Sequence, residues 1–512
     1  MSKQPPRGDP YDEDSLPTRL TTGVDGLDSI LYGGLPADRV YLVEGDPGTG
    51  KTTLGLQFLL EGVRRGEPTL YLTLSETKEE LLAVARSHGW SMDGIYIHEL
   101  IPSEESLKPE EQYTIFHPSE VELSDTTEAV LEEVERIKPQ RIVFDSLSEM
   151  RLLARDPLRY RRQILALKQY FIGRRCTVLL LDERTTDTND RNAQSIAHGV
   201  IMLEHLAQEY GAVRRRLRVI KVRGSRFRGG YHDFKIETGG LVTFPRLIAA
   251  EHHREFVREV VSSGTPELDD LLGGGLNRGS STLFMGPAGS GKSSLAAQFA
   301  VSAAEQGEHA AIYLFDEGIG IYLARAAGIG IDLRGHMEAG RIKVQQIDSS
   351  ELTPGEFAHL VRSSVERDKA RVVVIDSLNG YLNAMPEERF LSVQLHELLM
   401  YLNQQGIVTM LVMAQHGVFG MAMTSPVDVS YLTDAVLLLR YFEAEGAVRK
   451  ALSVFKNRAG THESTIREFQ ITPQGIRIGR ALTEFQGVLT GVPTYTGKKE
   501  PLLREGDDEP RT

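Results

Sequence analysis

Short apolar runs alternate with longer amphipathic segments through the first half of the chain. Four runs have the length and composition of buried strands: residues 39–45, 68–74, 141–146 and 176–182. Three segments carry apolar residues at helical spacing instead: residues 51–65, 76–89 and 124–138. Strands that alternate with helices predict a mostly parallel sheet with both faces covered, which is an α/β fold.

The second half of the chain repeats the first. The segment that begins at Thr21 aligns without a gap with the segment that begins at Ser262, and the correspondence resumes further along each copy. A period this long exceeds the roughly 20–50 residues of a solenoid unit, so it indicates a duplicated domain. We expect one domain over residues 16–248 and a second over residues 249–490, with flexible polar ends at residues 1–15 and 491–512.

Each copy contains the phosphate-loop motif G-x-x-x-x-G-K-[ST] between a predicted strand and a predicted helix. The glycines let successive backbone N–H groups turn toward phosphate oxygens, and the helix N-terminus adds its positive dipole end. Lys51 and Lys292 are expected to reach the β- and γ-phosphates of ATP, and the hydroxyls of Thr52 and Ser293 to ligate Mg²⁺. The predicted ATP-binding residues are Gly45, Gly48, Thr49, Gly50, Lys51, Thr52 and Thr53 in the first copy, and Gly286, Gly289, Ser290, Gly291, Lys292, Ser293 and Ser294 in the second.

Acidic residues follow the apolar runs near each phosphate loop. Asp145 and Asp376 end such runs, which suits the residue that holds Mg²⁺ beside the loop. Another strand in each copy ends at Ser75-Glu76 or at Asp316-Glu317. Glu76, Asp316 and Glu317 are candidate catalytic carboxylates that orient a water or accept a proton beside the γ-phosphate. Capping of the next helix is the alternative interpretation for Ser75 and Glu76.

A basic stripe runs from Arg214 to Arg228, and the second copy retains part of it. Alternate residues of a strand share one face, so Lys221 pairs with Arg223, and Lys456 with Arg458, as candidate phosphate contacts. The phosphate would belong to a nucleotide in the same or a neighbouring subunit, or to a nucleic acid. A solvated strand face remains the third interpretation.

Overall composition narrows these alternatives. The chain has a net charge of −13, so it is not built as a whole to coat nucleic acid or an anionic membrane. Its single cysteine, Cys176, excludes an internal disulfide and a multi-cysteine metal site. No apolar run reaches the length of a membrane span, and the first residues lack the apolar core of a signal peptide. We therefore expect a cytoplasmic protein with no membrane partner.

The tandem phosphate loops, the glycine-rich segment before each, the Asp-Ser strand ends and the motif IREFQIT together resemble the KaiC family of circadian clock ATPases and autokinases, in the RecA/DnaB superfamily. The resemblance covers residues 16–490 and implies two tandem RecA-like domains. It further implies a two-tiered hexamer with ATP and Mg²⁺ at subunit interfaces, where Lys221, Arg223, Lys456 and Arg458 would act in trans. Clock-type adaptor proteins are the partners that it implies.

The chain departs from the family pattern at two points. The family's paired glutamates correspond to Ser75-Glu76 and Asp316-Glu317, and its adjacent Ser-Thr phosphoacceptors to Ser430-Tyr431, which leaves Ser430 as the acceptor. The leading hypothesis is a Mg²⁺-dependent ATPase whose second domain also phosphorylates its own serine, acting as a signalling or clock-type oligomer. The alternatives are a RecA/DnaB-like nucleic-acid motor or recombinase, and a nucleotide-gated scaffold without kinase activity.

Overall fold

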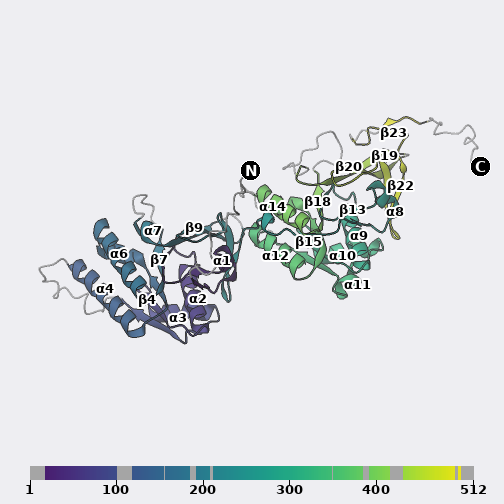
Figure 1. Cartoon of the computed structure of the whole chain (residues 1–512). Helices are drawn as coiled ribbons and strands as arrows, with labels where there is room; N and C mark the ends of the chain where they lie inside the picture. Colours follow the sequence, from purple (N-terminus) through teal and green to yellow (C-terminus); the bar gives the residue numbers. More distant parts are fainter. Residues whose placement is uncertain are drawn as a thin grey trace, which may run out of the picture. The chain divides into compact units, whose positions relative to one another are not determined.

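The computed structural model describes residues 18–100, 118–154, 156–184, 192–207, 211–348, 350–383, 391–415, 431–444, 446–489 and 494–497. The chain divides between Arg246 and Leu247 into two compact units (Figure 1).

Within the described residues, the first unit is built on a nine-stranded sheet in the order β11-β10-β9-β8-β3-β7-β6-β4-β5. The strands are β3 (Val40–Gly45), β4 (Thr69–Thr73), β5 (Ile95–Glu99), β6 (Arg141–Asp145), β7 (Thr177–Glu183), β8 (Gly199–Leu206), β9 (Arg214–Val222), β10 (His232–Glu237) and β11 (Gly240–Phe244). Strands β3 to β8 pair in parallel, and β9 to β11 extend the sheet in antiparallel pairs.

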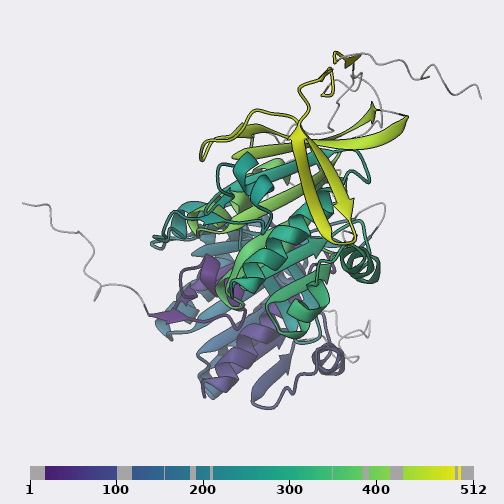
Figure 2. The ribbon, with the colours of Figure 1, turned by 90° about the vertical axis from the view of Figure 1, so that its right-hand side faces the viewer.

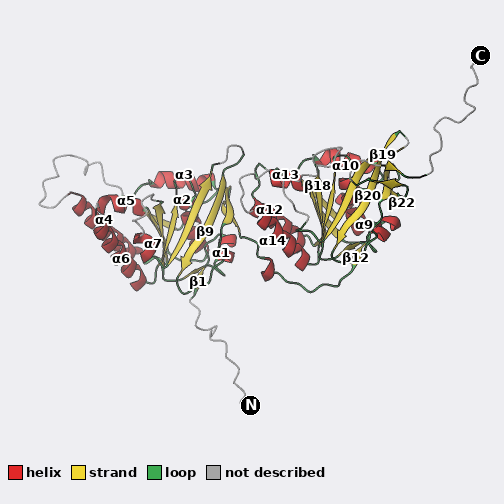
Figure 3. Ribbon diagram, turned by 90° about the horizontal axis from the view of Figure 1, so that it is seen from above, coloured by secondary structure: helices red, strands yellow, loops and turns green. Residues whose placement is uncertain are grey.

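Helices cover both faces of this sheet (Figure 3). One face packs against α1 (Asp25–Ile30), α2 (Lys51–Arg64) and α3 (Lys78–Ser87), and the other against α4 (Pro118–Ile137), α5 (Leu147–Ala154), α6 (Pro157–Gly173) and α7 (Asn192–Ile196). Local sequence fixes two of the helix starts: Thr77 and Glu80 form a capping box at α3, and the Asp156 side chain caps α6 ahead of Pro157.

The second unit repeats this plan, with a sheet in the order β16-β15-β17-β18-β14-β19-β20-β21-β22 over its described residues. Its strands are β14 (Ser281–Gly286), β15 (His309–Leu314), β16 (Ile342–Gln346), β17 (Ala370–Asp376), β18 (Val408–Ala414), β19 (Ala435–Ala444), β20 (Ala447–Asn457), β21 (Arg467–Thr472) and β22 (Gly475–Ala481). Figure 2 shows the antiparallel strands β19 to β22 at the yellow-green end of the colour scale.

One face of the second sheet packs against α8 (Pro266–Leu271), α9 (Lys292–Glu305), α10 (Ile319–Gly328) and α11 (Leu333–Glu338), and the other against α12 (Pro354–Glu366), α13 (Leu378–Asn383) and α14 (Leu391–Gln404). The matching strand orders confirm the predicted duplication and the predicted α/β class. In both units a central parallel strand, β3 or β14, leads into the phosphate loop.

Candidate nucleotide-binding sites

The first phosphate loop joins β3 to α2. Gly48 and Gly50 have φ angles of 78° and 99°, in the left-handed region where a side chain is strained. Lys51 Nζ donates hydrogen bonds to the carbonyl oxygens of Gly45 at 2.8 Å and Asp46 at 3.1 Å. Burial lowers the pKa of this ammonium, so the loop already holds a desolvated cation above its backbone. Such a loop is shaped to receive phosphate.

The second phosphate loop has the same form. Gly289 and Gly291 have φ angles of 74° and 107°, and Lys292 Nζ donates a 2.7 Å hydrogen bond to the carbonyl of Pro287. Lys292 is buried, which lowers its pKa to about 8. The two loops therefore present one lysine each in equivalent positions.

A hydroxyl and a carboxylate meet beside each lysine. Thr52 Oγ1 donates to Asp145 Oδ2 at 3.3 Å, and a hydrogen bond from Ser293 lowers the pKa of Asp376. Burial outweighs that bond and raises the pKa of Asp376 to about 6. Asp376 Oδ2 is buried and has no hydrogen-bond partner among the described residues. An orphaned carboxylate oxygen next to a hydroxyl fits a hard cation such as Mg²⁺.

No group of three His, Cys, Asp or Glu side chains in the described part of the chain converges as a metal site. A cation at Asp145 or Asp376 would therefore be held by one carboxylate, one hydroxyl, water and the nucleotide. Mg²⁺ is commonly held in this way beside phosphates, whereas all-protein cages suit other metals.

A buried tyrosine adds a contact that the sequence motifs do not contain. Tyr71 on β4 donates a 2.6 Å hydrogen bond to Asp145 Oδ2. This bond and the one from Thr52 favour the ionised form, but burial dominates and raises the pKa of Asp145. In the second unit Tyr322 of α10 occupies the neighbourhood of Asp376, and its hydroxyl has no hydrogen-bond partner among the described residues.

Glu76 lies beside the first phosphate loop with its Oε2 buried and without a hydrogen-bond partner among the described residues. Burial, followed by the nearby charges of Asp145 and Glu80, raises the pKa of Glu76 to about 7. The side chain of Thr77, not Ser75 or Glu76, caps α3, so the capping interpretation of those two residues is wrong. Glu76 is left available to take a proton near neutral pH.

The two carboxylates of the second unit are both engaged within the unit. Ser377 Oγ donates a short hydrogen bond to Asp316 Oδ2, and Arg325 donates one of 2.7 Å to Glu317 Oε1. Gly380 approaches Asp316 so closely that a Cβ there would lie 2.5 Å from Oδ1. The two sites thus hold their carboxylates differently.

The candidate trans residues lie at the other end of each sheet from the phosphate loop. Lys221 pairs with Val200, which pairs with Leu42, the third residue of β3 and three residues before Gly45. Lys456 pairs with Val436, which pairs with Leu283, the third residue of β14 and three residues before Gly286. The following arginines are anchored there too, Arg223 to the carbonyl of Ser195 and Arg458 to that of Tyr431. The predicted acceptor Ser430 itself lies outside the described residues.

The basic stripe is largely used inside the first unit. Arg214 and Arg228 are buried, and Arg216 donates a 3.0 Å hydrogen bond to Glu204. The guanidinium groups of Arg216 and Arg218 lie over the ring of Tyr231. The stripe is therefore not one continuous exposed basic surface of the kind that tracks a nucleic-acid backbone.

The structure brings one more carboxylate to the first site. Glu183, the last residue of β7, lies opposite Gly45 in the parallel pair of β7 with β3. Glu183 is the acidic residue that acts most strongly on Lys51, and its negative charge partly offsets the lowering of the Lys51 pKa by burial. Glu183 belongs to no local motif, because its place beside the loop depends on the strand order. Its only signal in the sequence is a carboxylate at the end of a buried apolar run.

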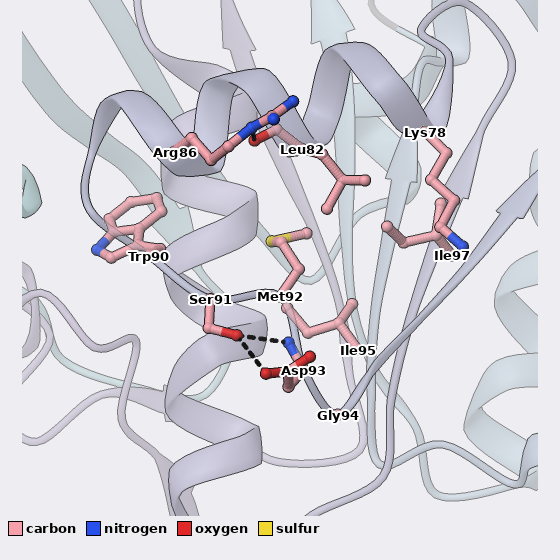
Figure 4. Close-up of a pocket in the computed structure, with 10 residues that line it drawn as sticks. All are labelled: Lys78, Leu82, Arg86, Trp90, Ser91, Met92, Asp93, Gly94, Ile95 and Ile97. Atoms are coloured by element: carbon pink, nitrogen blue, oxygen red, sulfur yellow. Dashed lines mark hydrogen bonds between the residues drawn. The ribbon is translucent and has the colours of Figure 1, made fainter.

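A separate hollow of about 460 Å³ lies between α3 and β5, with no phosphate-loop residue in its lining. Figure 4 shows the chain's one tryptophan, Trp90, on one side and Lys78 on the other. Ser91 Oγ donates to Asp93 Oδ2 at 2.7 Å and accepts from the Asp93 N–H at 3.1 Å. These bonds fix the turn that borders the hollow.

The fold and the two phosphate loops define a protein with two tandem phosphate-loop domains of the RecA type. A family model described as "ATPase: KaiC" matches residues 20–247 and 261–483. The chain therefore belongs to the KaiC ATPase family, and it uses ATP as that family does. No helix in the described part of the chain is long and apolar enough to cross a membrane.

Relatives with the same two-domain span are named for the circadian clock. The chain is 27% identical over 492 residues to the circadian clock protein KaiC3 of Synechocystis sp., covering 94% of this chain and 96% of the relative. It is also 27% identical over 495 residues to the circadian clock oscillator protein KaiC of Parasynechococcus marenigrum, covering 95% of each chain.

Proposed function

We propose that both units bind MgATP at their phosphate loops and hydrolyse it, and that the second unit also transfers the γ-phosphoryl group to Ser430. The observation that carries the proposal is the repeated set of a desolvated lysine, a hydroxyl and a buried carboxylate at the carboxyl end of a central strand. Mg²⁺ bound by Thr52 and Asp145, or by Ser293 and Asp376, would neutralise charge on the β- and γ-phosphates.

In the first unit Glu76 acts as the base. Its raised pKa means that it can accept a proton from the attacking water near neutral pH. In the second unit Asp316 and Glu317 take the corresponding place, and the acceptor is the hydroxyl of Ser430. Phosphoserine at position 430 adds about −1.5 to −2 charges two residues after Asp428 and four before Asp434 in the sequence, so the modification would act as a switch.

The nucleotide is shared between neighbouring chains. Lys221 and Arg223, like Lys456 and Arg458, lie too far along the strands to reach the phosphate loop of their own sheet, since each residue of a strand adds about 3.3 Å. We propose that they contact the neighbour's γ-phosphate within a hexamer, as a signalling or clock-type assembly with adaptor proteins. Trans cations of this kind accelerate phosphoryl transfer by about 10³–10⁵-fold.

Light scattering with and without MgATP, combined with phosphate release and γ-labelled ATP, tests the proposal. We expect a particle near six times 56.9 kDa with MgATP, EDTA-sensitive hydrolysis, and label on Ser430 by peptide mass spectrometry. A monomeric protein under saturating MgATP would contradict the proposed contacts between neighbouring chains. Hydrolysis without label on Ser430 would contradict the proposed kinase activity and support an ATPase without autophosphorylation.

A further inference from the structure

The first site has a carboxylate that neither the phosphate-loop motif nor the family pattern assigned. Glu183 ends β7, which lies next to β3 in the sheet. Its partner across the parallel pair is Gly45, the first residue of the phosphate loop. Adjacent strands are about 4.8 Å apart, so the backbone of Glu183 lies immediately beside the loop.

The pleat of β7 sets the direction of the side chain. Leu179 and Leu181 pack on the sheet face covered by α2, and Leu180 packs on the opposite face. Because side chains alternate along a strand, Glu183 projects on the same face as Leu181. That face carries the N-terminus of α2, with Lys51 and Thr52. Asp182 projects on the other face, where Arg151 and Ser148 hold it.

Two contacts fix the backbone of Glu183 in this position. Its N–H donates to Ser148 Oγ at 3.2 Å and to Asp182 Oδ1 at 3.0 Å. The carboxylate also lies near enough to Lys51 for its negative charge to act on that ammonium. The carboxylate therefore lies on the side of the sheet that carries Lys51, at the end of the strand that borders the phosphate loop.

The second site lacks this group. The residue registered opposite Gly286 is Ala414, whose backbone is held by Asn379 on both its N–H and its carbonyl. The second site instead has Asp316 where the first has Ser75. Apart from the aspartate proposed to bind Mg²⁺, each site thus has two acidic side chains. They are Glu76 and Glu183 in the first site, and Asp316 and Glu317 in the second.

We propose that Glu183 is the second catalytic carboxylate of the first site, in place of the one that Ser75 does not provide. The inference rests on the proposed hydrolysis of ATP at that site. The attacking water forms its bond to the γ-phosphorus while the bond to the β–γ bridging oxygen breaks and ADP keeps the electron pair. One proton of the water passes to Glu76, and the other O–H donates its hydrogen bond to Glu183, which aims the oxygen at the phosphorus.

The test uses the full chain carrying Lys292→Ala, so that phosphate release reports the first site. We expect Glu183→Gln to slow kcat by about 10- to 100-fold while ATP binds equally well or more tightly, because a negative charge near the phosphates has been removed. Glu183→Ala should behave alike, and adding Ser75→Asp to it should recover most of the lost rate. Glu99→Gln, at the end of the edge strand β5, is the matched control and should leave kcat unchanged.

The possible failures are distinguishable. Wild-type kcat in Glu183→Gln together with a slow Glu76→Gln would overturn the role of Glu183 and leave the proposed function standing. Weaker ATP binding with unchanged kcat would also overturn it, since that pattern indicates a structural role. A slow Glu183→Ala that Ser75→Asp fails to rescue would overturn the replacement of one carboxylate by the other. Wild-type rates in Glu76→Gln, Glu183→Gln and Lys51→Ala alike would instead remove hydrolysis at this site.

Discussion

The phenol of Tyr71 donates a 2.6 Å hydrogen bond to Oδ2 of Asp145, the same oxygen that the hydroxyl of Thr52 contacts. Both partners of this bond are buried. A residue on a neighbouring strand therefore orients the carboxylate proposed to bind Mg²⁺ and partly offsets the rise in its pKa that burial causes, as outer hydrogen bonds do at many metal sites.

Tyr71→Phe is expected to destabilise the nucleotide-free first unit by about 1–3 kcal/mol, because it removes a buried hydrogen bond to a charged group. It should also raise the Mg²⁺ concentration needed for half-maximal hydrolysis several-fold. Urea unfolding and Mg²⁺ titration measure the two effects. Tyr322→Phe is the control: its hydroxyl lacks a hydrogen-bond partner within the described residues, so its loss should be near neutral. Equal destabilisation by both changes would contradict the assignment.

Hydrolysis at the first site should depend on the protonation of Glu76. A base must be ionised, and burial raises the pKa of Glu76 to about 7. In a Lys292→Ala background, kcat/KM is expected to rise with pH and level off above about 7; a bound cation nearby shifts the rise to lower pH. Glu76→Gln should lose this rise along with most of the activity. A rate independent of pH between 5 and 8, measured at about 25 °C, would exclude Glu76 as the base.

Nucleotide binding at the two phosphate loops should be lost independently when the lysine of each loop is replaced. Lys51→Ala and Lys292→Ala each remove a charge-assisted contact to phosphate, so each is expected to lose nucleotide binding at its own site and retain it at the other. Counting bound nucleotide per chain by equilibrium dialysis checks this. Wild-type hydrolysis by the double variant would show that the phosphate loops are not the sites.

The two carboxylates of the second unit, Asp316 and Glu317, should contribute unequally to phosphoryl transfer. Arg325 pairs with Glu317 at 2.7 Å, whereas Asp316 contacts Ser377, next to Asp376. Asp316→Asn is therefore expected to lower labelling of Ser430 about 100-fold or more, and Glu317→Gln to lower it less. Quantitative mass spectrometry of the modified peptide compares the two. A larger loss in Glu317→Gln would reverse the assignment.

The parts of the site that follow from local sequence were predictable. The loop from Gly45 to Lys51 needs a strand, a turn and a helix that are contiguous in the chain, and its motif contains the residues that each requires. The place of Asp145 beside Thr52 was predictable because the carboxyl ends of parallel strands meet at one edge of a sheet, whereas its role in holding Mg²⁺ stays a prediction. Because the domain is duplicated, the phosphate-loop motif and the aspartate at a strand end each occur twice in the sequence.

The contacts between distant strands were not predictable. Tyr71 and Asp145 become neighbours only because β4 and β6 pair in register, and Glu183 meets Gly45 only because β7 lies beside β3. Strand order arises from the packing of the whole sheet, which no local pattern specifies. The internal contacts of the basic stripe were unpredictable for a related reason. The sequence shows the charges but not that Arg216 binds Glu204 and lies over the ring of Tyr231.

The antiparallel strands β9 and β20 put the cationic pair of each unit and its phosphate loop at opposite ends of one sheet. If the cationic pair of one chain completes the nucleotide site of the next chain, two variants with different defects can complement each other. A chain with Lys51→Ala still carries an intact Lys221 and Arg223, and a chain with Lys221→Ala and Arg223→Ala still carries an intact phosphate loop. Mixing the two inactive variants should therefore regenerate complete first-unit sites wherever they alternate around the assembly, a complementation that neither variant shows alone.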